Sequence, residues 1–196
     1  MKPSIVVFAS GSGSNFQALI DACRDNRIPA TIKGLIVTRE DAGAVERAKN
    51  HGIPYRVLSK SDFNSNEDLA DAINHHLDKW NPSLIILAGY LEKLPVEVIE
   101  QNSCPIINIH PSLLPKYGGK GYYGIKVHRA VIENGDKESG CTTHLVTPNY
   151  DEGQILNQAH VPVYENDTPE TLAGRIRPHE HRILIETVNQ LIHNST

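Results

Sequence analysis

The stretch SIVVFASGSGSNFQALIDAC, Ser4 to Cys23, combines a predicted strand, a glycine-rich turn and a predicted helix. Ser4 to Ala9 is a short apolar run with β-branched residues, which is typical of a buried strand. Gly11 to Gly13 breaks that run, and the pattern then predicts a helix over about residues 15–25. A strand that leads through a tight turn into a helix is the opening unit of an α/β fold. Four apolar residues recur at spacings of three and four on one side of this helix: Phe16, Leu19, Ile20 and Cys23.

The same alternation continues along the chain. The predicted strand at residues 83–88 is apolar at every position after Ser83, as expected for a strand covered on both faces. We therefore predict an α/β fold: a doubly wound, mainly parallel sheet with helices on both faces, Rossmann-like in its N-terminal half, followed by late antiparallel strands and a C-terminal helix. Further strands are expected at residues 34–38, 55–58, 105–110, 141–146 and 154–164, and further helices at residues 42–50, 67–80, 125–134 and 169–193.

The composition limits the classes of partner. Charged residues make up 21% of the 196 residues and the formal net charge is −4, without a basic block, so we expect no nucleic-acid partner. No apolar run approaches the roughly eighteen residues of a membrane span, so we expect no membrane partner. The 3 cysteines form no Cys-x-x-Cys pair. This pattern favours free thiols in a reducing compartment, and we expect a cytoplasmic protein.

The glycine-rich turn is a candidate anion site. Free backbone N–H groups and the helix dipole favour an anion at a helix N-terminus. Phe16 occupies the position of the third glycine in a dinucleotide fingerprint, and no Gly-Lys-Ser/Thr follows as in a P-loop. A small phosphate monoester therefore fits better than a dinucleotide or ATP. The alternative is a plain tight turn in which Ser14 or Asn15 caps the helix.

A polar pair ends the strand at residues 105–110. Side chains alternate in a strand, so Asn108 and His110 share one face while Ile107 and Ile109 pack on the other. A carboxamide can donate to a developing oxyanion, and an imidazole can pass a proton. Asp151, in a loop between two late strands, is the candidate carboxylate partner and would raise the pKa of the imidazole. The pattern predicts acid–base work on a carbonyl.

Other chemistries find less support in the sequence. His75, His76, His179 and His181 form neither a His-Glu-x-x-His pattern nor a Cys/His quartet, so we expect no metal. No Gly-x-Ser-x-Gly elbow is present, and Cys104 has no adjacent base.

The blocks NIHPSLLP at residues 108–115 and DEGQIL at residues 151–156 resemble the folate-dependent formyltransferase superfamily. VVFASGSGSNFQALIDAC at residues 6–23 and LAGYL at residues 87–91 extend the similarity, which runs from residue 5 to about residue 186. The opening block is similar to members that formylate glycinamide ribonucleotide in purine biosynthesis. The resemblance implies direct attack of that amine on the formyl group of N10-formyltetrahydrofolate, the co-substrate, without a metal.

The resemblance also implies roles for individual residues. Asn108 and protonated His110 would act on the formyl carbonyl, with Asp151 supporting the histidine and managing the proton that the amine loses. Glu180 would face the ribose, and it lies four residues from both Ile176 and Leu184 on an inward stripe. The phosphate end of the nucleotide would contact Gly13, Ser14, Asn15, Phe16 and Gln17.

The folate would lie between two segments of the chain. Residues 91–94 would line its pocket and residues 147–151 would close it from the other side. Asn66 and Glu92 stand where the family pattern leads us to expect basic residues, and Lys93 could substitute for them. The residues implied for the folate are Asn66, Leu91, Glu92, Lys93, Leu94 and Asn108.

The resemblance implies one formyltransferase domain over residues 1–196. Residues 1–100 would be its nucleotide-binding half, and residues 101–196 its catalytic and folate-binding half. The partners would be small molecules, and the protein a monomer or a homodimer. Two alternatives stay open: a formyltransferase that acts on another amine, such as methionyl-tRNA or an amino sugar, and a non-catalytic nucleotide-binding module. A formyltetrahydrofolate hydrolase would need an additional regulatory domain.

We also expect Pro178 to break or kink the last helix.

Overall fold

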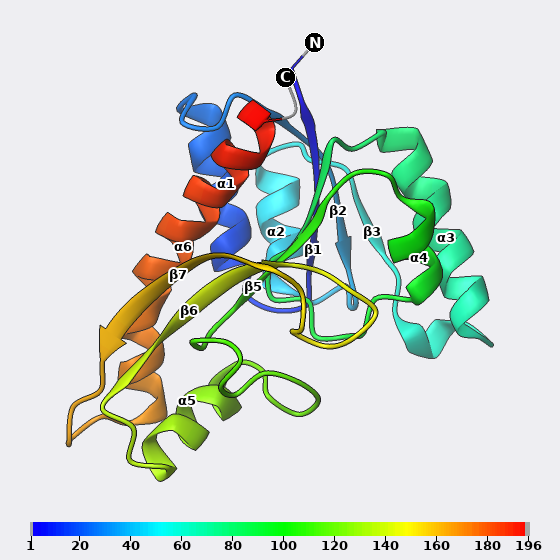
Figure 1. Ribbon diagram of the computed structural model, residues 1–196. Coiled ribbons are helices and arrows are strands. Elements are labelled where there is room, and N and C mark those ends of the chain that lie inside the picture. The colour runs from blue at the N-terminus through cyan, green and yellow to red at the C-terminus, as the bar shows by residue number, and fades with distance from the viewer. Residues whose placement is uncertain (1, 195–196) are drawn as a thin grey trace.

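A seven-stranded sheet forms the centre of the computed structural model, which describes residues 2–194 (Figure 1). The strand order is β3-β2-β1-β4-β5-β6-β7. β1 to β5 run parallel, whereas β6 pairs antiparallel with both β5 and β7. The predicted sheet and its late antiparallel strands are confirmed. The strands are β1 (Ser4–Ala9), β2 (Thr31–Val37), β3 (Tyr55–Val57), β4 (Leu84–Leu87), β5 (Ile106–His110), β6 (Glu138–Leu145) and β7 (Ile155–Pro162).

Helices cover both faces of the sheet. α1, α2 and α6 pack against one face, and α3 and α4 pack against the other, while α5 lies beside the antiparallel end (Figure 1). The apolar side chains of the central strands alternate between the two cores: Val7 of β1 belongs to the first and Phe8 to the second. The helices are α1 (Ser14–Arg24), α2 (Gly43–Asn50), α3 (Asn66–Trp80), α4 (Val96–Gln101), α5 (Ile125–Glu133) and α6 (Pro169–Asn194), with a 3₁₀ turn at Lys60–Asp62.

Three expectations need correction. β2 and β6 each begin three residues before the predicted runs at 34 and 141, because pairing with neighbouring strands extends them through polar residues. The short helix α4 has too few turns to show a helical period in the sequence. Finally, α6 continues through Pro178. Pro178 and Gly174 both lie on the exposed side of α6, so water can reach the carbonyl four residues before the proline.

Candidate active site

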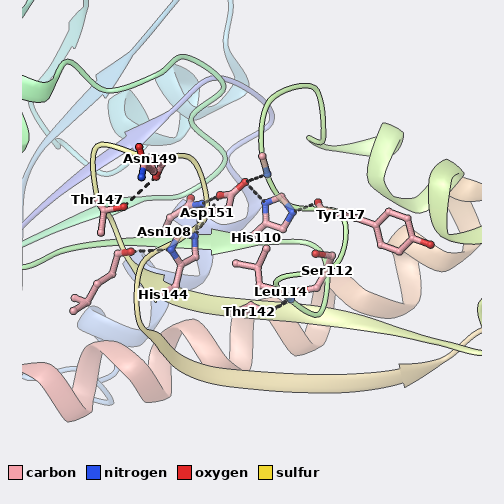
Figure 2. Close-up of polar contacts among 12 residues, drawn as sticks. Asn108, His110, Ser112, Leu114, Tyr117, Thr142, His144, Thr147, Asn149 and Asp151 are labelled. Atoms are coloured by element: carbon pink, nitrogen blue, oxygen red, sulfur yellow. Dashed lines mark hydrogen bonds and ion pairs between the residues drawn. The ribbon is translucent and has the colours of Figure 1, made fainter.

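A cavity of about 250 Å³ opens at the carboxyl ends of β4 and β5, where open α/β sheets bind ligands. Three loops surround it: residues 87–94 after β4, residues 119–124 before α5, and residues 146–151 between β6 and β7. Asn108, His110 and Asp151 all line this cavity. The structure therefore brings together the three side chains that the sequence predicts for catalysis (Figure 2).

Asn108 reaches the cavity because β5 alternates as predicted. Ile107 and Ile109 pack into the core beneath α1 and α6, so Asn108 and His110 point the other way. Nδ2 of Asn108 lies 3.1 Å from Nε2 of His144 and 3.5 Å from Oδ1 of Asp151. The carboxamide is thus held with its donor group in the cavity wall.

His110 is fixed in one orientation by a backbone carbonyl. Its Nε2 lies 2.8 Å from the carbonyl oxygen of Tyr117 (Figure 2). A carbonyl can only accept, so Nε2 carries the hydrogen and donates it. The other ring nitrogen, Nδ1, faces Oδ2 of Asp151 at 3.6 Å. Nδ1 is therefore the atom at which His110 can gain or lose a proton in the cavity.

The pKa of His110 differs from the sequence-based expectation. The side chain is only 5% exposed, and this burial lowers the pKa below its ordinary value. The charge of Asp151 and the bond to Tyr117 act in the opposite direction but do not outweigh the burial. The predicted rise in the pKa of His110 is wrong in its net direction, although Asp151 by itself does raise this pKa. His110 is therefore uncharged near neutral pH in the free site.

Asp151 joins both imidazoles of the site. It has a left-handed backbone with φ of 55°, and its Oδ2 accepts a hydrogen bond from the Gly119 amide at 2.8 Å. Burial alone would raise the pKa of this carboxyl. Its interactions with His144, His110 and the Gly119 amide together lower the pKa instead. Asp151 is thus an anion at neutral pH, poised beside a neutral His110.

His144 is a member of the site that sequence reasoning missed. It is 2% exposed, its Nδ1 donates to the Leu145 carbonyl at 2.8 Å, and its Nε2 lies 3.5 Å from Oδ1 of Asp151. The antiparallel register places it directly opposite Asn108. The available signal was the position of His144 on the same face of its strand as Thr142, but the partner strand could not be read from that pattern.

The loop after His110 is anchored by a buried hydroxyl. Thr142 Oγ1 donates to the Ser112 carbonyl at 2.6 Å and accepts from the Leu114 amide at 3.1 Å (Figure 2). Nε2 of Gln158 completes the set, at 2.9 Å from the same hydroxyl and 3.1 Å from the Leu114 carbonyl. This network fixes the loop between His110 and Tyr117, which places the Tyr117 carbonyl next to His110.

The residues implied for the folate divide into two groups. Residues 91–94 line the cavity, and Nζ of Lys93 lies 5.2 Å from the centre of the Tyr150 ring, which closes the other side. The carboxylate of Glu92 accepts a hydrogen bond from the Lys60 amide at 3.2 Å. Asn66, by contrast, is the exposed first residue of α3 and does not line the cavity.

The glycine-rich turn lies at the N-terminus of α1, as predicted. Gly13 caps this helix with φ of 72°, without a side-chain cap, so neither Ser14 nor Asn15 has the capping role that was the alternative. The first bond runs from the Gln17 amide to the Gly13 carbonyl at 2.9 Å. The amides of residues 14–16 therefore have no carbonyl partner within the helix, which suits them to an anion.

The side chains of the turn have different roles. Phe16 is buried in the core, and Oε1 of Gln17 accepts a hydrogen bond from Arg47 at 3.0 Å. Asn15 is 9% exposed, and its side chain interacts with the carboxylate of Glu180, which lies half-buried on α6. Burial raises the pKa of Glu180 to about 7, and the Asn15 bond only partly offsets this.

Ser10 connects the glycine-rich turn to the cavity. Its Oγ accepts a hydrogen bond from the Leu91 amide at 3.0 Å, and its own amide donates to the Gly89 carbonyl at 2.9 Å. The turn after β1 and the loop after β4 are thus adjacent.

Within residues 2–194 no group of three or more His, Cys, Asp and Glu side chains could hold a metal ion. No helix in the same range combines the length and apolar character that a bilayer crossing requires.

The family model described as "Formyl transferase" matches residues 3–188. The phosphoribosylglycinamide formyltransferase of Escherichia coli K12 is 39% identical over 180 residues, covering 92% of this chain and 82% of the relative. The chloroplastic phosphoribosylglycinamide formyltransferase of Arabidopsis thaliana is 42% identical and that of Vigna unguiculata 41%, and each alignment covers 97% of this chain. The chain spans only 65% and 61% of the lengths of these two plant relatives.

Solved structures give the same result. The crystal structure of glycinamide ribonucleotide transformylase 1 from Symbiobacterium toebii is 37% identical, with a TM-score of 0.92 over 98% of this chain and 89% of that one. The phosphoribosylglycinamide formyltransferase structure from Brucella melitensis is 40% identical, with a TM-score of 0.88 over 98% of this chain and 96% of that one.

Proposed function

The chain belongs to the formyl transferase family, and on that premise we propose that it transfers a formyl group from N10-formyltetrahydrofolate to the amine of glycinamide ribonucleotide, a step of purine biosynthesis. The observation that carries the proposal is the meeting of Asn108, His110 and Asp151 in one cavity. A carboxamide donor, a neutral imidazole and a carboxylate are the groups that acyl transfer to an amine requires. The relatives that share this fold are named for the same reaction.

Asn108 stabilises the oxygen on which negative charge develops. Its Nδ2 lies in the cavity wall, where one hydrogen is directed to His144 at 3.1 Å and the other makes a longer contact of 3.5 Å with Asp151. The hydrogen of the longer contact is the one that can turn to the developing oxyanion at little cost. One such donor is worth about 3 kcal/mol in the transition state.

His110 and Asp151 act as a unit on the amine proton. The attacking amine must lose a proton, and neutral His110 can accept it at Nδ1, because Nε2 is committed to the Tyr117 carbonyl. Asp151, 3.6 Å away, then stabilises the imidazolium. The protonated Nδ1 can afterwards donate to the departing folate nitrogen. This order of events replaces the expectation that His110 begins protonated.

The two substrates would enter from neighbouring sides of the site. The amides of residues 14–16 and the adjacent Glu180 suit a phosphate and a ribose, respectively. The cavity rim exposes Leu91, Tyr122, Tyr123 and Tyr150, an apolar surface that fits the rings of a folate. The folate supplies the activated formyl group. Ser10 connects the glycine-rich turn to the folate side of the cavity through its hydrogen bond with the Leu91 amide.

We also propose the division of labour between the two halves of the chain. Residues 1–100 contribute the glycine-rich turn, and residues 101–196 contribute Asn108, His110 and Asp151. The folate surface draws on both halves, since residues 91–94 and 147–151 face each other across the cavity. The partners are small molecules, and the protein is a monomer or a homodimer. We propose the cytoplasm as its compartment, in keeping with its three free cysteines.

The proposal is tested by spectroscopic detection of tetrahydrofolate release from N10-formyltetrahydrofolate. We expect release with glycinamide ribonucleotide and none without an amine. Release that needs a different acceptor, such as an amino sugar, would assign the chain to that branch of the family. Release without any acceptor would indicate hydrolysis. If no release occurs with any acceptor although glycinamide ribonucleotide binds, the chain is a non-catalytic nucleotide-binding module.

A further inference from the structure

We propose that Tyr117 and Asp136 are positioning residues that fix the tautomer of His110. The hydroxyl of Tyr117 donates to Oδ2 of Asp136 at 2.9 Å. The backbone carbonyl of Tyr117 accepts from Nε2 of His110 at 2.8 Å, as Figure 2 shows. One residue therefore connects the loop after α5 to the imidazole in the cavity. The proposal rests on the proposed function only for its effect on rate, since the tautomer can be observed without substrates.

Asp136 is itself firmly held. Its Oδ1 accepts from Asn134 at 3.1 Å, and Nζ of Lys116 lies 3.2 Å from Oδ2. Its amide donates to the Val131 carbonyl of α5 at 3.3 Å. Burial raises the pKa of Asp136, but its hydrogen bonds with Tyr117, Lys116 and Asn134 and the charge of Lys116 together hold this pKa below its usual range. The carboxylate is thus a stable acceptor for the phenol of Tyr117.

The peptide unit that carries the Tyr117 carbonyl needs such an anchor. Tyr117 has φ of 55°, a left-handed conformation that is unfavourable for a non-glycine residue. The next two residues are Gly118 and Gly119, which permit rotation of this peptide unit. This peptide unit makes one further hydrogen bond, of 3.4 Å, from the Gly118 amide to the Pro115 carbonyl, and the Tyr117 ring packs against the core and against Tyr122. The phenol of Tyr117 therefore supplies much of the constraint on the direction of its carbonyl.

The other titratable groups near His110 do not replace this contact. Asp151 and His144 approach from the side of β6 and the loop that follows it, and Asp151 faces Nδ1 rather than Nε2. His128 of α5 lies close enough to influence His110 electrostatically, but within residues 2–194 the bond that Nε2 makes is the one to Tyr117. Without that carbonyl, the Nδ1–H tautomer would gain a carboxylate partner in Asp151. It would then be unable to accept a proton at Nδ1.

The test is ¹⁵N nuclear magnetic resonance of histidine-labelled protein, at a pH where His110 is neutral, with the His110 signals assigned from a His110→Asn spectrum. The unmodified protein should show the Nε2–H tautomer. Tyr117→Phe should show a substantial fraction of the Nδ1–H tautomer. It should also lose about tenfold in kcat with little change in KM, part of the 10²–10⁴ that a general base supplies. Tyr164→Phe removes a phenol from an exposed ring elsewhere and should change neither quantity.

Asp136→Asn separates a hydrogen bond from a charge effect. The amide can still bond the Tyr117 hydroxyl, so this variant should keep the tautomer and most of the rate. An unchanged tautomer in folded Tyr117→Phe would overturn the proposal, as would an Asp136→Asn variant that matches Tyr117→Phe. If Tyr117→Phe does not fold, Asp136→Ala removes the acceptor and should show the same tautomer change. A fixed tautomer in that variant would equally overturn the proposal.

Discussion

Nδ1 of His110 lies 3.6 Å from Oδ2 of Asp151, and the two side chains are only 5% and 11% exposed. With Nε2 bonded to a carbonyl, this is the contact at which a proton can be taken up and its charge compensated. The pair therefore combines a base that is neutral at rest with an anion that stabilises it once it is charged.

Removing the charge of Asp151 should alter both the rate and its pH dependence. Asp151→Asn takes away a contribution that raises the pKa of His110, so this pKa should fall further. Because neutral His110 is the working form, the acid limb of kcat should move to lower pH. The rate on the plateau should fall about 10²- to 10⁴-fold, because the imidazolium loses its partner. Turnover against pH and a ¹⁵N titration of His110 measure both effects. A titration that stays in place or moves to higher pH would remove Asp151 from this role.

The hydroxyl of Thr142 should contribute to stability. Thr142→Val keeps the shape of the side chain but leaves the Leu114 amide and Nε2 of Gln158 without this acceptor in a buried place. We expect the free energy of unfolding to fall by about 1–3 kcal/mol, measured by denaturant titration. Thr31→Val, at an exposed position, is the matched control and should change it by less than about 0.5 kcal/mol. Equal effects in the two variants would contradict the role of the network.

The glycine-rich turn contains two glycines with different demands. A Cβ at Gly13 would lie 2.8 Å from Cα of Ala44, and φ there is 72°. Gly13→Val should therefore destabilise the fold. The added side chain would also block the close approach of a phosphate to the backbone. A Cβ at Gly11 would meet nothing within 4 Å. Gly11→Ala should leave the melting temperature nearly unchanged but weaken nucleotide binding in calorimetry, if the ligand approaches the backbone there. A folded Gly11→Ala with full nucleotide affinity would speak against that approach.

The half-buried carboxyl of Glu180 should make stability depend on pH. Its pKa is about 7 in the folded protein, whereas the ordinary value is 4.5. The folded state therefore binds more protons between these values, and its stability contribution is lost as the pH rises through this window. Glu180→Gln should be stabilised relative to the unmodified protein at about pH 8, and less so at about pH 5. Exposed Glu165→Gln is the control for denaturant titrations at both pH values. A pH-independent difference for Glu180→Gln would contradict the raised pKa.

Much of the fold could be predicted because local patterns and burial agree. β4 is apolar throughout and β1 is apolar after Ser4, and both lie inside the parallel sheet, covered on both faces. The helix α4 escaped prediction because a run of Val96–Gln101 is too short for a period of 3.6 residues to appear. The start of β6 escaped because Glu138 is polar and becomes a strand only through its partner in β7.

The site was predictable in its side chains but not in their electrostatics. Asn108 and His110 follow from strand alternation, and Asp151 from the resemblance to a family. His144 enters through an antiparallel register that no local pattern encodes. The Tyr117 carbonyl is a backbone atom and leaves no mark on residue type. The lowered pKa of His110 reflects burial, which depends on how the three loops close around it.

We propose that Asn108 and its neighbours stabilise the transition state of formyl transfer to glycinamide ribonucleotide. The most direct test is kcat of Asn108→Ala in the tetrahydrofolate-release assay, together with calorimetric affinities for each substrate, and with exposed Asn64→Ala as the control. We expect a kcat lower by about 10²- to 10³-fold at nearly unchanged affinities, because the Asn108 amide acts chiefly when charge develops on the formyl oxygen. An Asn108→Ala variant that keeps its kcat, or whose loss of activity is explained by weaker substrate binding, would contradict this role of Asn108.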